Sequence, residues 1–167
     1  MSKFKIEIKW AIIFCVMLLV WMFLERLAGL HSEHIDKHPI YTNFGALPAI
    51  AIFVFALLDK RKNYFHGAMT YKQGFVTGLI ITLIVTVLSP LIQFITSTII
   101  SPDYFANAIK YSVGEGKMTQ EAAENYFNMK SYIVQGLIGT PFMGLLTSAI
   151  VAIFIKRDAK AKLNGKN

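Results

Sequence analysis

GFVTGLIITLIVTVLSPLIQFITSTII, residues 74–100, decides the fold because it is apolar and carries no charged side chain. An α-helix rises about 1.5 Å per residue, so a hydrocarbon core of about 30 Å needs about 20 apolar residues. The stretch exceeds this length, and a backbone in lipid must pair its polar groups internally. It therefore predicts a membrane-spanning helix. Pro90 predicts a bend within it, because proline lacks the N–H that the preceding turn needs.

Three more apolar stretches predict three further spans, and the fold class is an all-α, integral membrane four-helix bundle. We predict one membrane domain, residues 1–167, with spans at about 10–30, 40–58, 74–100 and 132–155. The polar segment before the last span predicts two short helices at about 102–113 and 120–130, capped by Ser101 and Thr119. A basic tail, residues 156–167, follows the last span.

Small residues recur at every fourth position in two of the predicted spans. The third span has Gly74, Gly78, Thr82 and Thr86, and the fourth has Gly136, Thr140, Gly144, Ser148 and Ala152. Small side chains let two helix backbones approach closely in a membrane. We predict that these two ladders face each other. The alternative is that one or both of them mediate self-association.

The composition favours a membrane protein over a soluble one. Hydrophobic residues make up 54% of the chain, charged residues make up 16%, and the apolar residues lie in blocks. The net charge is +7, and twelve lysines and arginines lie on the side of the termini and the 59–73 loop against five on the other side. Because basic residues concentrate on the cytoplasmic side, we expect both termini there and the two short helices outside. The basic rim suits anionic lipid headgroups, so nucleic acid is not needed as a partner.

Few residues suggest chemistry. The single cysteine, Cys15, lies inside the first span and is expected to be a packing residue. Glu25 and Arg26 lie near the outer end of that span. Charges at this depth reach the headgroups or pair with a neighbouring helix, and this interpretation is favoured over a functional one.

A histidine-rich loop, HSEHIDKHP, follows at residues 31–39 and contains His31, His34 and His38 beside Glu33 and Asp36. Imidazoles and carboxylates are ligands of zinc and other divalent metals, and histidines can also respond to pH. The spacing matches no zinc motif, and Pro39 interrupts the stretch. The sequence favours a solvated turn, with a metal site and a pH-responsive patch as alternatives. No catalytic, cofactor-binding or metal residue is assigned, and no cofactor is expected.

Six segments resemble a family of small bacterial membrane proteins catalogued as domain of unknown function 4199. They are KFKIEIKWAIIF, HIDKHPIYTNFGALPAI, ALLDKRK, MTYKQGF, SPLIQFITSTIISPDYF and KMTQEAAENYF. The resemblance covers roughly residues 3–157. It implies four spans and a bacterial inner membrane, and it carries no activity or site residue.

Three function classes remain open from the sequence. The favoured one is a non-enzymatic structural, accessory or assembly protein, because no nucleophile elbow, phosphate loop or HExxH motif is present. Its partners would be the bilayer and either a second copy or another membrane protein. The alternative is a small oligomeric transporter or channel with a polar path through Asn43, Gln93 and Gln135. An enzyme that uses the histidine loop with Glu25, Glu33 or Asp36 is the least favoured.

Overall fold

The computed structural model describes residues 4–157 of the chain. Within this range, four helical segments are long and apolar enough to cross a membrane, which confirms the all-α, four-helix architecture. They are α1 (Lys5–Leu27), the combined segment of α2 (His38–Tyr41), η1 (Thr42–Gly45) and α3 (Ala46–Asn63), then α4 (Tyr71–Ile95) with the π-helical η2 (Thr96–Ile100), and finally α7 (Met129–Ile155). Two short helices, α5 (Tyr104–Gly114) and α6 (Gln120–Tyr126), lie between η2 and α7.

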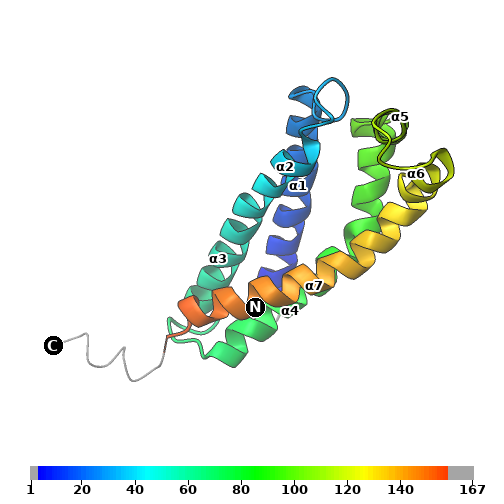
Figure 1. The fold of residues 1–167 in the computed structure, drawn as a ribbon. Helices are drawn as coiled ribbons and strands as arrows, with labels where there is room; N and C mark the ends of the chain where they lie inside the picture. Colours follow the sequence, from blue (N-terminus) through cyan, green and yellow to red (C-terminus); the bar gives the residue numbers. More distant parts are fainter. Residues whose placement is uncertain (1–3, 158–167) are drawn as a thin grey trace.

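The helices form two pairs that are closest at one end of the bundle (Figure 1). The α1 and α3 helices lie side by side, and α4 runs along α7. Both described ends of the chain lie at the same end of the bundle, called here the termini end. The 28–37 loop, α2, α5 and α6 lie at the opposite end, called the cap end. The α3 and α7 helices diverge toward the cap end.

The α4 and α7 helices pack through the two small-residue ladders, as the sequence predicted. A Cβ atom added to Gly78 would lie 2.4 Å from Ser148 Oγ, and one added to Gly144 would lie 2.3 Å from Thr82 Oγ1. Farther toward the termini end, a Cβ on Gly74 would meet the Ala152 side chain at 3.3 Å. These distances are possible only where two helix backbones are in close contact, so dispersion between them stabilises the pair.

The termini end is held by backbone pairing and by a buried core. Met69, at the start of the turn into α4, exchanges both backbone hydrogen bonds with Arg157, at 2.8 and 2.9 Å. Arg61 Nη1 also donates to the carbonyl oxygen of Ile155 at 2.7 Å. The buried core beside these contacts includes Cys15, which is 6% exposed and packs as predicted. The end of α3, the α3–α4 connection and the end of α7 are therefore fixed together.

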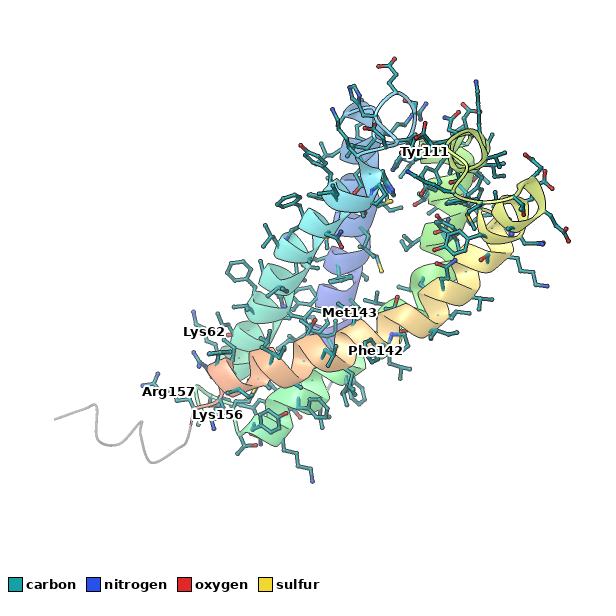
Figure 2. All side chains as sticks on the ribbon, viewed as in Figure 1. Lys62, Tyr111, Phe142, Met143, Lys156 and Arg157 are labelled. Atoms are coloured by element: carbon teal, nitrogen blue, oxygen red, sulfur yellow. The ribbon has the colours of Figure 1, made fainter. Side chains whose placement is uncertain are left out.

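Two acidic residues at the termini end, Glu7 and Asp59, are each paired with a lysine. Glu7 and Lys60 are 1% and 3% exposed, and Lys60 Nζ lies 2.8 Å from Glu7 Oε1. At the rim, Asp59 accepts hydrogen bonds from Lys9 and from Trp10 Nε1. Figure 2 shows Lys62, Lys156 and Arg157 projecting at the same end. The predicted basic side of the bundle is thus one physical surface, although Lys3 and residues 158–167 lie outside the described range.

The α4 and α7 helices run continuously through their prolines, and the changes of helix type at η1 and η2 lie toward the cap end. Pro90 lies inside α4, and Ser89 Oγ donates at 2.9 Å to the Thr86 carbonyl, the acceptor that an N–H at position 90 would have served. The 3₁₀ turn η1 ends just before Pro48, and Pro141 lies inside α7. The local hydroxyl at Ser89 explains how a helix in lipid tolerates its proline.

Two predicted helix boundaries need correction. Ser101 does not cap α5, because Asp103 holds the N-cap position and the Ser101 side chain contacts His31 instead. The second short helix ends at Tyr126 rather than near 130, because Asn128 begins α7 by accepting a hydrogen bond from the Ser131 N–H at 2.9 Å. The predicted cap by Thr119 is confirmed, with the Ala122 N–H as its donor.

Candidate functional site

A buried carboxylate at the cap end is the centre of the candidate site. Glu25 lies in the last turn of α1 and is 2% exposed. Trp21, one turn earlier, donates its indole N–H to Glu25 Oε1 at 2.5 Å. Gly45 of η1 lies against this indole, where an added Cβ would be 2.9 Å from Trp21 Nε1. The glycine therefore lets η1 close over the tryptophan that orients Glu25.

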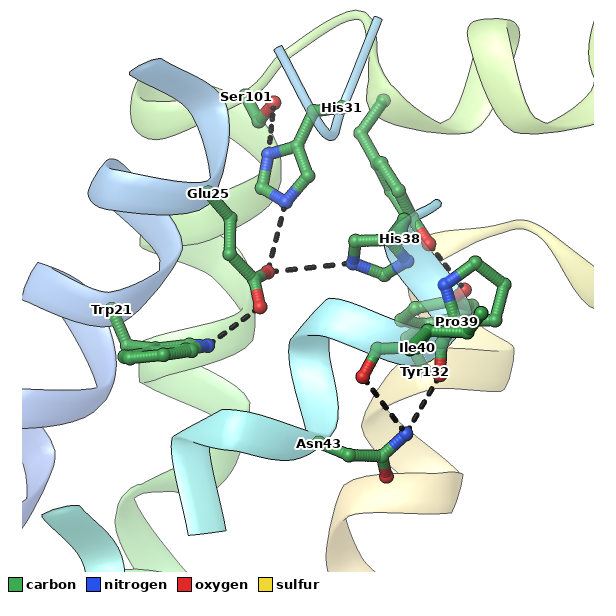
Figure 3. A network of polar contacts seen from close by, with 10 residues as sticks. Trp21, Glu25, His31, His38, Pro39, Ile40, Asn43, Ser101 and Tyr132 are labelled. Atoms are coloured by element: carbon green, nitrogen blue, oxygen red, sulfur yellow. Dashed lines mark hydrogen bonds and ion pairs between the residues drawn. The ribbon is translucent and has the colours of Figure 1, made fainter. Parts of the chain in front are cut away.

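Two histidines converge on the other oxygen of this carboxylate (Figure 3). His31 Nε2 lies 3.2 Å and His38 Nε2 lies 3.4 Å from Glu25 Oε2. The His31 side chain is 4% exposed and the His38 side chain is 18% exposed. The chain reverses after α1 at Gly29, which has a φ of 74°, a conformation that favours glycine. This reversal brings residue 31 back over the end of α1, and the start of α2 supplies residue 38.

A further ring of contacts fixes the two imidazoles. His31 Nδ1 lies 2.9 Å from Ser101 Oγ, and the His31 carbonyl accepts a hydrogen bond from Asn107 Nδ2 at 3.0 Å. The Tyr104 ring packs against both imidazoles, with centroid distances of 5.0 and 5.3 Å. Burial raises the pKa of the Tyr104 phenol and the charge of Glu25 acts in the same direction, whereas the hydrogen bond with Tyr132 opposes the shift. The phenol therefore stays neutral beside the site at physiological pH.

The cluster differs from the solvated turn that the sequence favoured. His31 is buried rather than solvated, and Glu25 pairs with His31 and with His38 of α2, which is the neighbouring-helix outcome expected for it. His34 is exposed and stays outside the cluster, as a turn residue would. Arg26 likewise has the neighbouring-helix outcome, because it donates to the Ile100 carbonyl at the end of η2.

A cavity of about 480 Å³ lies between α3 and α7, where these helices diverge. It is floored by α1 and α4 and is lined mainly by apolar and small side chains. Its lining includes Ile50, Phe53, Val85, Gln135, Gly136, Gly139, Thr140, Met143 and Thr147. Met143 projects from the middle of α7 in Figure 2. Gly139 is the least crowded of the three glycines in the lining, because a Cβ added there would meet no atom within 4 Å.

The polar path considered from the sequence does not form. Asn43 donates to the Pro39 carbonyl at 2.7 Å, and Gln93 donates to Ser97 Oγ at 2.7 Å, so both amides serve their own chain segments. Gln135 lines the cavity, and its amide donates to Ser131 Oγ one turn away. Of the three residues expected to share one path, the structure brings only Gln135 to the cavity.

Comparison with known proteins gives one match. The family model described as "Protein of unknown function (DUF4199)" matches residues 9–157, which covers all four long helices except the first residues of α1. No curated protein and no solved structure matches the chain.

Proposed function

We propose that this chain, which belongs to the DUF4199 family of proteins of unknown function, is a non-enzymatic accessory or assembly protein of the bacterial inner membrane. It would act by receiving a membrane-spanning helix of another protein in the cavity between α3 and α7. The observation that carries the proposal is the open small-residue face of α7 at Gly139.

The α7 helix carries more small residues than its contact with α4 uses. Gly144 and Ser148 contact α4 closely, and Gly144 also lines the cavity, whereas a Cβ added to Gly139 in the same lining would meet no atom within 4 Å. A small face in a membrane permits close packing of another helix, and shape complementarity then holds the two together. The open position at Gly139 therefore favours close packing with a membrane-spanning helix that this chain does not itself supply.

The proposal of a non-enzymatic role is supported by what the most enzyme-like group of described residues lacks. Ser101, His31 and Glu25 are connected as in a serine hydrolase triad, with contacts of 2.9 and 3.2 Å. However, Ser101 is 6% exposed, its N–H donates to the Thr96 carbonyl, and Pro102 has no N–H. Positions 101 and 102 therefore have no free N–H to supply an oxyanion hole, which such chemistry needs.

The proposed orientation places the termini end in the cytoplasm and the Glu25 cluster outside. It is supported by the distribution of lysines and arginines, of which twelve belong to the termini side and five to the cap side. Those of the twelve that lie beyond residues 4–157 are counted from the sequence alone. The basic rim would then contact anionic headgroups of the inner leaflet.

Co-purification from native membranes tests the proposed role. The tagged protein should recover a partner membrane protein in a fixed ratio, and Gly139→Phe, which fills the cavity, should abolish its recovery. Ile138→Phe is the matched control, because Ile138 is 68% exposed and does not line the cavity. Recovery of the chain alone, or equal loss of partner in both variants, contradicts the proposal. Recovery of a second copy would assign the cavity to self-association.

A small oligomeric transporter or channel is the second candidate. It is favoured by Gln135 in the cavity wall and by Pro48 and Pro141 in the two helices that form the opening, since prolines would allow these helices to break around a transport site. Purified protein reconstituted in liposomes should then show solute flux that Gly139→Phe blocks. Absence of flux across a broad solute panel would exclude it.

A further inference from the structure

We propose that Glu25, His31 and His38 form a binding site for a divalent transition metal, with zinc as the ion that fits the donors best. This site is separate from the cavity between α3 and α7 and does not depend on what that cavity receives. It differs from the solvated turn that the sequence favoured, because it rests on the convergence of three ligand atoms from separate segments of the chain.

The spacing of the ligand atoms fits a tetrahedral ion. One oxygen or nitrogen atom from each of the three residues lies within 4.8 Å of the other two. Zinc binds such atoms at about 2.0–2.1 Å, so two ligands at a tetrahedral angle are about 3.3 Å apart. The two distances from Glu25 Oε2 to the histidine Nε2 atoms, 3.2 and 3.4 Å, bracket that value. The donor atoms of the two histidines lie no more than 4.8 Å apart, so they must approach each other by at most about 1.5 Å to hold one tetrahedral ion.

The donor set is also chemically suited to zinc. Two imidazoles and one carboxylate are the protein ligands of several zinc enzymes, which leave the fourth position to water. One carboxylate offsets half of the charge of a divalent ion, and the open position lets water stabilise the remainder. Softer ions prefer sulfur, and no sulfur atom belongs to this group of ligands.

The residues around the cluster match the outer shell that metal-bound histidines require. A bound His31 Nε2 leaves Nδ1 as the protonated nitrogen, and Ser101 Oγ at 2.9 Å is placed to accept its hydrogen bond. The Trp21 indole N–H holds Glu25 Oε1, which leaves Oε2 directed at the histidines. Outer-shell contacts of this kind fix the ring orientation, and a bound ion would displace the proton through which His31 Nε2 contacts Glu25.

An ion can reach the cluster from the side of the bundle. A shallow pocket between α1 and η1 has Glu25 among its lining residues, beside Trp21, Leu24, Tyr41 and Phe44. The His38 side chain keeps an exposed fraction of 18%. Under the proposed orientation, this entrance lies at the outer surface of the membrane.

Metal binding by the purified full chain tests the proposal. The protein carries a histidine-free affinity tag, is stripped with a chelator in detergent, and is titrated with Zn²⁺ against a chromogenic competitor. We expect one Zn²⁺ per chain, and Co²⁺ in its place should give the visible absorption of a tetrahedral site. His38→Ala should lower the affinity by more than about 100-fold, because loss of an outer-shell partner alone costs about 10–100-fold. Ser101→Ala should fall within that smaller range.

His34→Ala is the matched control, since His34 lies in the same loop but is exposed and outside the cluster. It should bind Zn²⁺ like the unmodified chain. Thermal unfolding keeps the test informative if a variant is less stable: Zn²⁺ should raise the midpoint of the unmodified protein and of His34→Ala, but not that of a folded His38→Ala. Absence of stoichiometric binding, or equal losses in His34→Ala and His38→Ala, would overturn the metal site and leave the proposed partner role untouched.

Discussion

Replacing Gly144 by alanine tests the register of the α4–α7 contact. The added Cβ would lie 2.3 Å from both Thr82 Cγ2 and Thr82 Oγ1, and 2.8 Å from Thr82 Cβ. Carbon atoms pack favourably at about 3.5–4.0 Å, so the helices must separate by about 1 Å or Thr82 must move. Rotation of Thr82 brings no relief, because both of its branches clash and its hydroxyl donates to the Gly78 carbonyl at 2.9 Å.

The control for this substitution is on the same helix. The Cβ that Gly139→Ala adds would meet no atom within 4 Å. This substitution should therefore raise the free energy of unfolding only through the higher helix propensity of alanine, by about 0.5–1 kcal/mol. Gly144→Ala gains the same propensity and adds the overpacking cost of about 1–3 kcal/mol. The difference between the two free energies of unfolding therefore isolates the clash, and it should be about 1–3 kcal/mol in favour of Gly139→Ala.

Unfolding in one detergent, followed by circular dichroism, measures this difference. Thr82→Ala should partly rescue Gly144→Ala, because it removes the two atoms at 2.3 Å but keeps the Cβ at 2.8 Å. Such a rescue would appear as a coupling energy in a double-mutant cycle. If Gly144→Ala and Gly139→Ala have the same stability, the two ladders do not meet in this register and the reasoning fails.

The remaining predictions concern buried polar groups. Lys60→Met should cost about 3–5 kcal/mol of stability because it leaves Glu7 buried and unpaired, and the double variant with Glu7→Leu should recover most of the loss in the same unfolding assay. Ser148→Ala should stabilise the protein by about 1 kcal/mol, because Ser148 Oγ is buried without a hydrogen-bond partner among residues 4–157, and an unchanged midpoint would mean that its burial carries no cost. The raised pKa of Tyr104 means that the folded state binds its proton more tightly than the unfolded chain, so this contribution is present below about pH 10 and is lost as the pH rises through the folded pKa. Tyr104→Phe should therefore flatten the alkaline fall of the unfolding midpoint, and an equal fall in both proteins would refute this origin.

Much of the architecture follows from residue patterns that act locally. The four spans come from apolar length, and the α4–α7 contact comes from a shared period of four small residues. Both properties belong to individual helices, so they can be read without knowing the tertiary structure. Thr119 was predicted correctly as a cap for the same reason.

The candidate site could not be predicted in this way because it depends on contacts distant in the sequence. His31 and Ser101 are separated by 70 positions, and they meet only because η2 ends beside α1. Ser101 precedes a proline and an aspartate, a pattern that also fits a helix cap, so local reasoning gave it the wrong role. The only local signals were a glutamate inside an apolar span and a glycine before the histidine loop, and neither specifies where the two histidine rings point.

The cavity has a similar origin. Each lining residue is ordinary for a membrane helix, and the opening arises from the divergence of α3 and α7. The alternative of a transporter placed Asn43 and Gln93 in a polar path with Gln135, but each amide donates to an acceptor within its own segment. Such local bonding is the usual fate of an isolated polar side chain in a membrane helix.

Labelling of single cysteines in intact cells tests the whole arrangement most directly. In a Cys15→Ser background, a membrane-impermeant maleimide should label His34→Cys and Glu115→Cys from outside, because both positions are exposed at the cap end. Lys62→Cys and Lys156→Cys, at the termini end, should react only after the membrane is permeabilised. The reverse pattern would contradict the orientation. Labelling of Lys62→Cys and Lys156→Cys from opposite sides would contradict the four-span bundle itself.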